Sequence, residues 1–197
     1  MPSSFTTLSI MNTALTQCGY DEILSMEDGT AEFTLMQRAW PGIVEAELEQ
    51  GRYSFSRAEV QLLSRVPGKF GFEDGYLVPN EALHVRRVWT DEETDPTQVA
   101  WVQDQSAVYV NAPAGIMAEI IVAPETSVFT AQFCQGVMHS LRAALLRAVA
   151  EYPAAREAES MAEIKFDSAR TVASKSRQST QAFRLGTIAE ARFGGRG

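Results

Sequence analysis

The chain has 197 residues, of which 45% are hydrophobic, which is enough for one domain with a buried core and an additional arm. Its two cysteines, Cys18 and Cys134, lie far apart in the sequence, which argues against a disulfide framework and indicates a reducing compartment. No apolar run reaches the roughly 18 residues of a membrane span, and the opening stretch MPSSFTTLSIMNTAL lacks the basic segment of a signal peptide. We therefore expect a soluble protein that is made in the cytoplasm and does not enter a membrane.

Charge is distributed unevenly along the chain. The net charge at pH 7 is −8, but residues 1–164 contain 10 Lys and Arg against 23 Asp and Glu, a net of −13, whereas residues 165–197 contain 7 against 2, a net of +5. An acidic body repels nucleic acid at long range, and a basic terminal segment is often an interaction tail. The sequence leaves open whether this segment binds a partner or is only a solvated end.

Two helices are predicted near the N-terminus. Residues 4–18 carry apolar side chains at helical spacing, with Ser3 or Ser4 as the N-cap. Residues 30–50 repeat the pattern, but Pro41 lacks an N–H donor and its ring crowds the carbonyl four residues earlier. We therefore expect a break or kink in the second helix just before this proline.

The middle of the chain changes to an alternating pattern. Residues 83–123 contain four short apolar segments that are typical of strands, ALHVRRVW, QVAWVQ, SAVYVN and IMAEIIVA. In the first of these, Leu83, Val85, Arg87 and Trp89 are expected on one face. The last three segments follow one another through connections too short for a parallel crossover, so we expect them to pair as antiparallel neighbours. The pattern predicts one small antiparallel sheet.

Two longer helices follow. Residues 127–152 have an unbroken apolar stripe, and residues 153–176, which begin at Pro153, have a narrow face of small residues that suits close packing. The short link between them predicts an antiparallel helical hairpin. The predicted fold class is α+β. A helical bundle with an inserted antiparallel β-sheet would occupy residues 1–178, and an extended C-terminal arm would occupy 179–197.

The residue types that carry out catalysis are scarce and poorly placed. His139 lies five residues after Cys134, about 500° around a helix, so the two side chains should not face each other well. His84 lies in a predicted strand with no Ser or Cys partner. No spacing suits a metal, the stretch PGKFGFEDG lacks the order of a phosphate loop, and the acidic stretches DEETD and EAELE are interpreted as a turn and a solvated helix face. We therefore predict no enzymatic activity, no cofactor and no metal.

Two tryptophans of the predicted sheet, Trp89 and Trp101, are the remaining candidates for a binding surface. Both lie among valines, so core packing is the favoured interpretation and a subunit contact is the alternative. Aromatic residues are not interleaved with basic residues on any one element, so the sequence does not predict a stacking platform for single-stranded nucleic acid.

The order of several motifs resembles a known family. ALTQCGYDEILSMEDGTAE ends the first helix and enters a loop, AWPGIVEAELEQGRYSFSRAEVQL combines an aromatic–Pro helix with an aromatic-x-Phe step, and YLVPNEALHVRRVW leads into the sheet. The helical hairpin from Phe129 to Ser176 completes the series. Over about residues 5–178 the chain resembles the head–tail adaptor (head-tail connector) proteins of tailed bacteriophages and gene transfer agents, including the tail tubular protein A group.

This resemblance implies a structural protein rather than an enzyme. Such adaptors form a ring, commonly of twelve copies, below the portal protein, where they extend the DNA channel and contact the next tail component, a stopper or a nozzle or tail tube protein. The implied location is the head–tail junction of a virion or phage-like particle that is assembled in the bacterial cytoplasm. DNA would pass through the ring without specific binding, which suits an acidic body because every neutralised phosphate adds affinity.

Within this interpretation the C-terminal arm is the predicted portal-docking segment. Residues 179–197, if extended, would span roughly 60 Å at about 3.3 Å per residue. Its expected apolar anchors and basic contacts are Phe183, Arg184, Leu185, Ile188, Arg192, Phe193 and Arg196. The glycines near its end would allow close approach of the backbone to a partner.

Three other functions stay open. One is a DNA-binding or packaging-accessory virion protein that holds phosphates with its basic tail. Another is a different structural role in the particle, such as a stopper or a tail-completion protein. The third is a virion hydrolase that uses His84 or His139.

Overall fold

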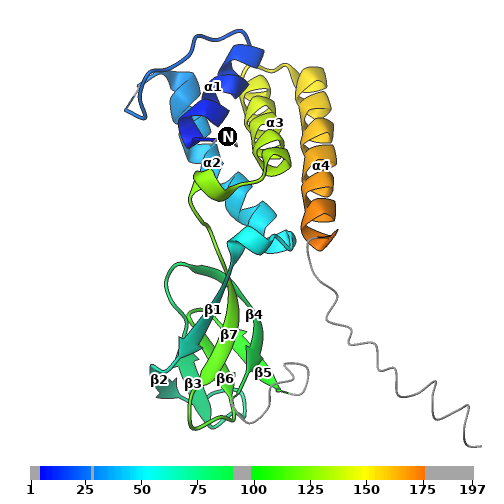
Figure 1. Cartoon of the computed structure of the whole chain (residues 1–197). Helices are drawn as coiled ribbons and strands as arrows, with labels where there is room; N and C mark the ends of the chain where they lie inside the picture. Colours follow the sequence, from blue (N-terminus) through cyan, green and yellow to red (C-terminus); the bar gives the residue numbers. More distant parts are fainter. Residues whose placement is uncertain (1–4, 28, 91–98, 176–197) are drawn as a thin grey trace, which may run out of the picture.

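The computed structural model describes residues 5–27, 29–90 and 99–175, with the helices gathered at one end of the molecule and the strands at the other (Figure 1). The helices are α1 (Thr7–Gln17), α2 (Ala31–Gln50), α3 (Ala131–Ala148) and α4 (Tyr152–Lys175), with 3-10 turns η1 (Ser54–Ser56) and η2 (Thr126–Val128). The strands all lie between α2 and α3 in the chain: β1 (Arg57–Leu62), β2 (Arg65–Pro67), β3 (Asp74–Leu77), β4 (Ala82–Trp89), β5 (Trp101–Asp104), β6 (Ala107–Val110) and β7 (Ile116–Val122). The predicted α+β class is confirmed.

The N-terminal helix begins later than predicted. Thr6, not Ser3 or Ser4, is the N-cap of α1, because its hydroxyl accepts a bond from the Ser9 amide at 3.1 Å while the Ser9 hydroxyl accepts one from the Thr6 amide at 3.0 Å. This reciprocal arrangement satisfies two donors that a helix start otherwise leaves without partners. At the other end, Gly19 has a φ of 83°, the left-handed conformation that often ends a helix.

Proline does not break the second helix. Pro41 lies inside α2, which continues to Gln50, so the helix is not broken there, and the alternative prediction of a kink stays a prediction. A proline inside a helix costs about 3 kcal/mol. Phe33 and Met36 before it and Leu48 after it are fully buried in the helical core, and this packing on both sides of the proline holds the helix together.

The long helical hairpin starts and turns at positions different from those predicted. Ser127 belongs to η2, and α3 begins only after its N-cap Thr130, whose hydroxyl accepts from the Phe133 amide at 3.4 Å. The turn follows Ala148, since Ala150 has a left-handed φ of 63°. The alanine face of α4 is buried as predicted and packs on α3.

Close packing of the hairpin depends on a glycine in the middle of α3. A Cβ atom added at Gly136 would lie 2.4 Å from the ring of Phe166 on α4. Phe166 is only 5% exposed, so its ring has little room to move away. The absence of a side chain at Gly136 therefore sets how closely α4 approaches α3.

The strands form two sheets rather than the single predicted one. One sheet has the order β1-β7-β4 and the other β2-β3-β6-β5, with every pairing antiparallel. The prediction missed β1, β2 and β3, which are short or polar and surround a loop rich in turn residues. It also paired β6 with β7, but the short link between them carries the chain from one sheet to the other.

Two irregularities in β4 change which of its residues are buried. The register with β7 shifts between Ala82 and His84 and again between Val85 and Arg87. Each shift inserts one extra residue, as in a β-bulge, so strict alternation fails. Val85 and Val88 are both fully buried in the core of the strand part, and the prediction that Arg87 shares the face of Val85 is wrong.

An aromatic cluster joins the helical and strand parts of the chain. Tyr53 and Phe55, which lead from α2 into β1, stack with ring centroids 5.1 Å apart, and Tyr53 packs edge-on against Phe133 of α3 at 5.0 Å. Phe129, just before α3, packs against Phe133 at 4.7 Å. Because both chain crossings meet in one packed cluster, we expect the junction to hold a fixed geometry.

Candidate functional site

Helix α3 lies at the centre of the helical part and has a groove on each side of its contact with α4. Helices α1, α2 and α4 all pack against α3, and α4 stands at the outer edge (Figure 1). One groove, here the α1-side groove, is bounded by α1, α3 and α4, and the other, the α2-side groove, by α2, α3 and α4. Two opposite sides of α4 are therefore open to a partner.

The α1-side groove has a volume of about 450 Å³ and no carboxylate in its lining. Its lining residues are Phe5, Ser9, Ile10, Thr13, Gln17, Cys134, Gln135, Met138, His139, Met161 and Lys165. Two buried polar atoms of this lining, the Gln135 Oε1 and the His139 Nδ1, have no hydrogen-bond partner in the described part of the chain. In a protein with 25 Asp and Glu, this groove presents a cation and unused polar groups without an acidic side chain.

Cys134 and His139 both line the α1-side groove. The prediction that their side chains do not face each other well stays a prediction, because lining the same groove does not place the sulfur and the imidazole in contact. Burial raises the pKa of the Cys134 thiol to about 11, and burial together with Arg142 and Lys165 lowers the pKa of His139. At neutral pH the thiol keeps its proton, so this pair does not supply an activated nucleophile.

The α2-side groove has a different chemistry. It has a volume of about 410 Å³ and is lined by Ala39, Ile43, Ser140, Ala143, Ala144, Arg147, Glu159, Ala162, Glu163 and Phe166. Its charged rim is partly paired, because Arg147 lies 2.5 Å from Glu159, and Glu163 lies 3.1 Å from Arg170. Small side chains thus line a hollow whose α4 edge carries two carboxylates.

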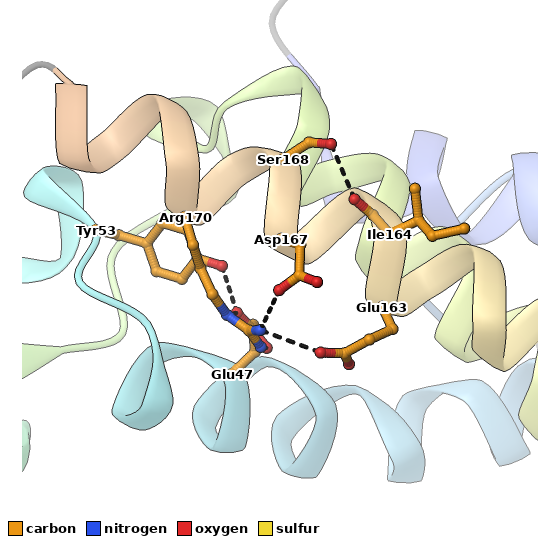
Figure 2. A network of polar contacts seen from close by, with 7 residues as sticks. All are labelled: Glu47, Tyr53, Glu163, Ile164, Asp167, Ser168 and Arg170. Atoms are coloured by element: carbon orange, nitrogen blue, oxygen red, sulfur yellow. Dashed lines mark hydrogen bonds and ion pairs between the residues drawn. The ribbon is translucent and has the colours of Figure 1, made fainter.

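An ion network centred on the buried Glu47 shares Glu163 with the lining of the α2-side groove (Figure 2). The Arg170 guanidinium of α4 donates to both carboxylate oxygens of Glu47 on α2, at 3.0 and 2.6 Å, and the Tyr53 hydroxyl donates to the same carboxylate. Arg170 also donates to Glu163 at 3.1 Å and to Asp167 at 2.9 Å. Three separate parts of the chain therefore meet at one carboxylate.

The network raises the pKa values of Tyr53 and Arg170, which favours the protonated forms that donate hydrogen bonds to Glu47. Burial and the bond to Glu47 raise the pKa of Tyr53, so the phenol stays protonated and can donate. The hydrogen bonds to Glu47 raise the pKa of Arg170. The prediction that the stretch EAELE is a solvated helix face is therefore wrong for Glu47, which is only 6% exposed. Its partner lies 123 residues further along the chain, so no local pattern could have indicated the pair.

The loop between β2 and β3 presents an aromatic and a basic residue together. Phe70 has a left-handed φ of 56° and packs edge-on against Tyr109 at 5.5 Å. The Lys69 ammonium lies 5.7 Å from the centre of the same ring and 3.5 Å from the Asp104 carboxylate. The lysine of PGKFGFEDG thus already has an acidic and an aromatic partner.

The two tryptophans proposed as a subunit contact lie in different sheets. Trp89 ends β4 and Trp101 begins β5, and both are half-buried. Trp101 packs against the core cluster of the strands. The core-packing interpretation accounts for the buried part of Trp101, and the subunit contact stays a prediction.

The predicted portal-docking residues lie outside the described residues. These are Phe183, Arg184, Leu185, Ile188, Arg192, Phe193 and Arg196, and the proposed boundary between body and arm at 178/179 also falls there. Within the ranges that the structure describes, no three His, Cys, Asp or Glu side chains converge in a way that could hold a metal ion. No helix in the same ranges is long and apolar enough to cross a membrane.

Comparison with known proteins adds no relative. No family model matches the chain, and no curated protein matches it.

Proposed function

We propose that this protein is a structural head–tail adaptor that forms a ring between the portal protein and the tail of a phage or gene transfer agent. The observation that carries the proposal is the division of the subunit into a helical bundle and a strand part inserted between α2 and α3 (Figure 1). This is the order of elements that the resemblance to adaptors implies. The copy number, twelve, and the location in the particle are taken from that resemblance alone.

The packing at the junction of the two parts supports a connector role for the subunit. The Glu47–Arg170 pair joins α2 to α4, and Tyr53 and Phe55, which precede β1, pack against Phe133 of α3. A connector has to transmit position from one neighbour to the next, so a fixed angle between its two parts is useful. The acidic body suits a channel through which DNA slides, since it offers few groups that neutralise phosphates.

The basic C-terminal segment is the proposed tether to the portal. Residues 179–197 contain three arginines and one glutamate, a net charge of +2 in a chain with a net charge of −8, and they contain four large apolar residues from Phe183 onward. Apolar side chains would anchor in portal pockets, and the arginines would meet acidic portal surface.

Electron microscopy of the full chain mixed with the portal protein of the same particle tests this proposal. We expect rings seated on the portal with the full chain and loss of portal binding when residues 179–197 are deleted. A second variant in which Arg184, Arg192 and Arg196 become glutamine separates charge from apolar anchoring and should bind portal more weakly. Portal binding that is undiminished by the deletion would refute the tether.

A second candidate function is a DNA-binding or packaging-accessory protein, which the basic segment alone favours. It requires measurable affinity for free duplex that falls steeply with salt, because phosphate contacts release counterions. The adaptor proposal requires little affinity for duplex even at low salt. Fluorescence anisotropy of a labelled duplex at two salt concentrations separates the two functions.

A further inference from the structure

We propose that neighbouring copies of this chain bind each other through α4, with one side of α4 in the first copy against the opposite side of α4 in the second. The α1-side groove and the adjoining face of α4 in one copy would pack against the α2-side groove of the next. This inference rests on the proposed ring and names the surfaces that close it. The partner is a second copy because the two sides are complementary in charge and because exposed aliphatic side chains of α4 can enter the α2-side groove.

The two grooves differ in the charge of their lining residues. Lys165 lies on the α1 side, half-buried, and forms no ion pair within the described ranges, and the lining around it contains no carboxylate. On the α2 side, Glu159, Glu163 and Asp167 follow one another at intervals of four residues, which places them along one edge of α4. Glu163 and Asp167 are each 65% exposed as side chains and stay accessible to a cation from a neighbour.

The existing ion pairs do not cancel the acidic character of the α2 side. Its carboxylates are those of Glu47, Glu159, Glu163 and Asp167, and they are shared between only two arginines, Arg147 and Arg170. One ammonium from the next copy would reduce this excess. Lys165 is the cation that the α1 side offers.

The apolar side chains of α4 support the same pairing. Ile164 and Val172 are 56% and 54% exposed, and Met161 lies between them around the helix on the α1 side. Exposed apolar residues are ordinary when they are isolated, but Ile164 and Val172, with the half-buried Met161, follow the helix beside Lys165. The α2-side groove is a hollow of about 410 Å³, and four of its ten lining residues are alanines. Protruding aliphatic side chains of one copy would fill this hollow in the next.

The symmetry of this contact fits a ring rather than a dimer. The two surfaces are different and lie on opposite sides of α4, so the contact is heterologous and each copy can bind one neighbour on either side. Repetition of such a contact closes into a ring when the rotation per copy permits it. The structure thus assigns the ring-closing contact to the edge of the helical part.

Exchange of charges between the two surfaces tests the pairing. Lys165→Glu makes both sides acidic, and Glu163→Lys places a lysine on each side, so each variant alone should associate at least about tenfold more weakly than the parent chain, because like charges meet. An equimolar mixture of the two variants should recover association, since every contact then joins opposite charges. Analytical ultracentrifugation of the full chain over a concentration series gives the association constants.

Two controls keep the result interpretable. Glu81→Lys makes the same change in net charge as Glu163→Lys, but on an exposed residue of the strand part, and should leave association unchanged. Ile164→Ser removes an exposed apolar side chain without a change in charge and should weaken association. Thermal unfolding of each variant checks that the fold is intact.

Several outcomes would overturn the inference. A parent chain that stays monomeric at the highest concentration reached, single variants that associate like the parent, or a mixture that does not recover would each exclude this contact. None of these outcomes bears on the arm, because portal binding is measured separately by deletion of residues 179–197. A failure of the ring contact and a failure of the adaptor proposal are therefore distinguishable.

Discussion

Replacement of Arg170 by methionine should destabilise the protein strongly, because it leaves the buried Glu47 carboxylate with the Tyr53 hydroxyl as its remaining partner in the network. The variant loses two charge-assisted hydrogen bonds, at 3.0 and 2.6 Å, to a side chain that is only 7% exposed. Each such bond is worth about 1.5–3 kcal/mol, and removal of one member of a buried pair costs about 3–5 kcal/mol.

Partial exposure lowers the expected effect. The Arg170 side chain is 27% exposed, so water screens part of its interaction, and its contacts with Glu163 and Asp167 are too exposed to add much. We therefore expect a loss of about 3 kcal/mol in the free energy of unfolding. Methionine keeps the aliphatic stem and the helix propensity, so the change isolates the guanidinium.

Urea unfolding at neutral pH, followed by circular dichroism and by tryptophan fluorescence, measures this loss. Arg156→Met is the matched control, since Arg156 lies on the same helix, is exposed and forms no ion pair within the described ranges. We expect the control to change the free energy of unfolding by less than about 0.5 kcal/mol. A double-mutant cycle with Glu47→Gln should give a coupling of about 2 kcal/mol. Equal losses for Arg170→Met and Arg156→Met would refute the view that this network stabilises the fold.

Three further predictions follow from the helical part. Gly136→Ala should destabilise the chain by about 1–3 kcal/mol, because the added methyl group overlaps the Phe166 ring; unchanged urea unfolding would show that α4 can move away at no cost. The pKa of His139 is lowered in the folded state, so the folded chain binds fewer protons than the unfolded chain below about pH 6.5 and its contribution to stability is lost as the pH falls. A larger drop in melting temperature between about pH 7.5 and about pH 5.5 for the parent than for His139→Gln is therefore expected, and parallel pH profiles of the two proteins would contradict this. The buried Cys134 thiol, with its pKa raised to about 11, should react with a thiol reagent at neutral pH far more slowly in the folded chain than in urea; equal rates would mean that the groove is open to the sulfur.

Features that depend on residues close together along the chain could be predicted from the sequence. The order of the helices was predicted correctly and their bounds nearly so. The reason is that apolar residues at helical spacing are a local pattern, which can be recognised without knowing what the helix packs against. The small-residue face of α4 is buried as predicted from Ala158 to Ala169, and the apolar stripe of α3 is buried except for Val149 at its end, which is 52% exposed. The α+β class follows from the same change of period that separates helices from strands.

Contacts between segments far apart in the sequence could be established only from the folded structure. Strand β1 pairs with β7, which lies more than fifty residues later, and the division into two sheets arises from such pairings rather than from any local pattern. The burial of Glu47 depends on Arg170, 123 residues away, and the pattern around Glu47 alone resembles a solvated helix. The opposite charges on the two sides of α4 were present in the sequence, but they became surfaces only when α1 and α2 packed on different sides of α3. The periodicity of the sequence indicates which residues become buried. Which segment they pack against depends on surface shape and charge, and these exist only in the folded chain.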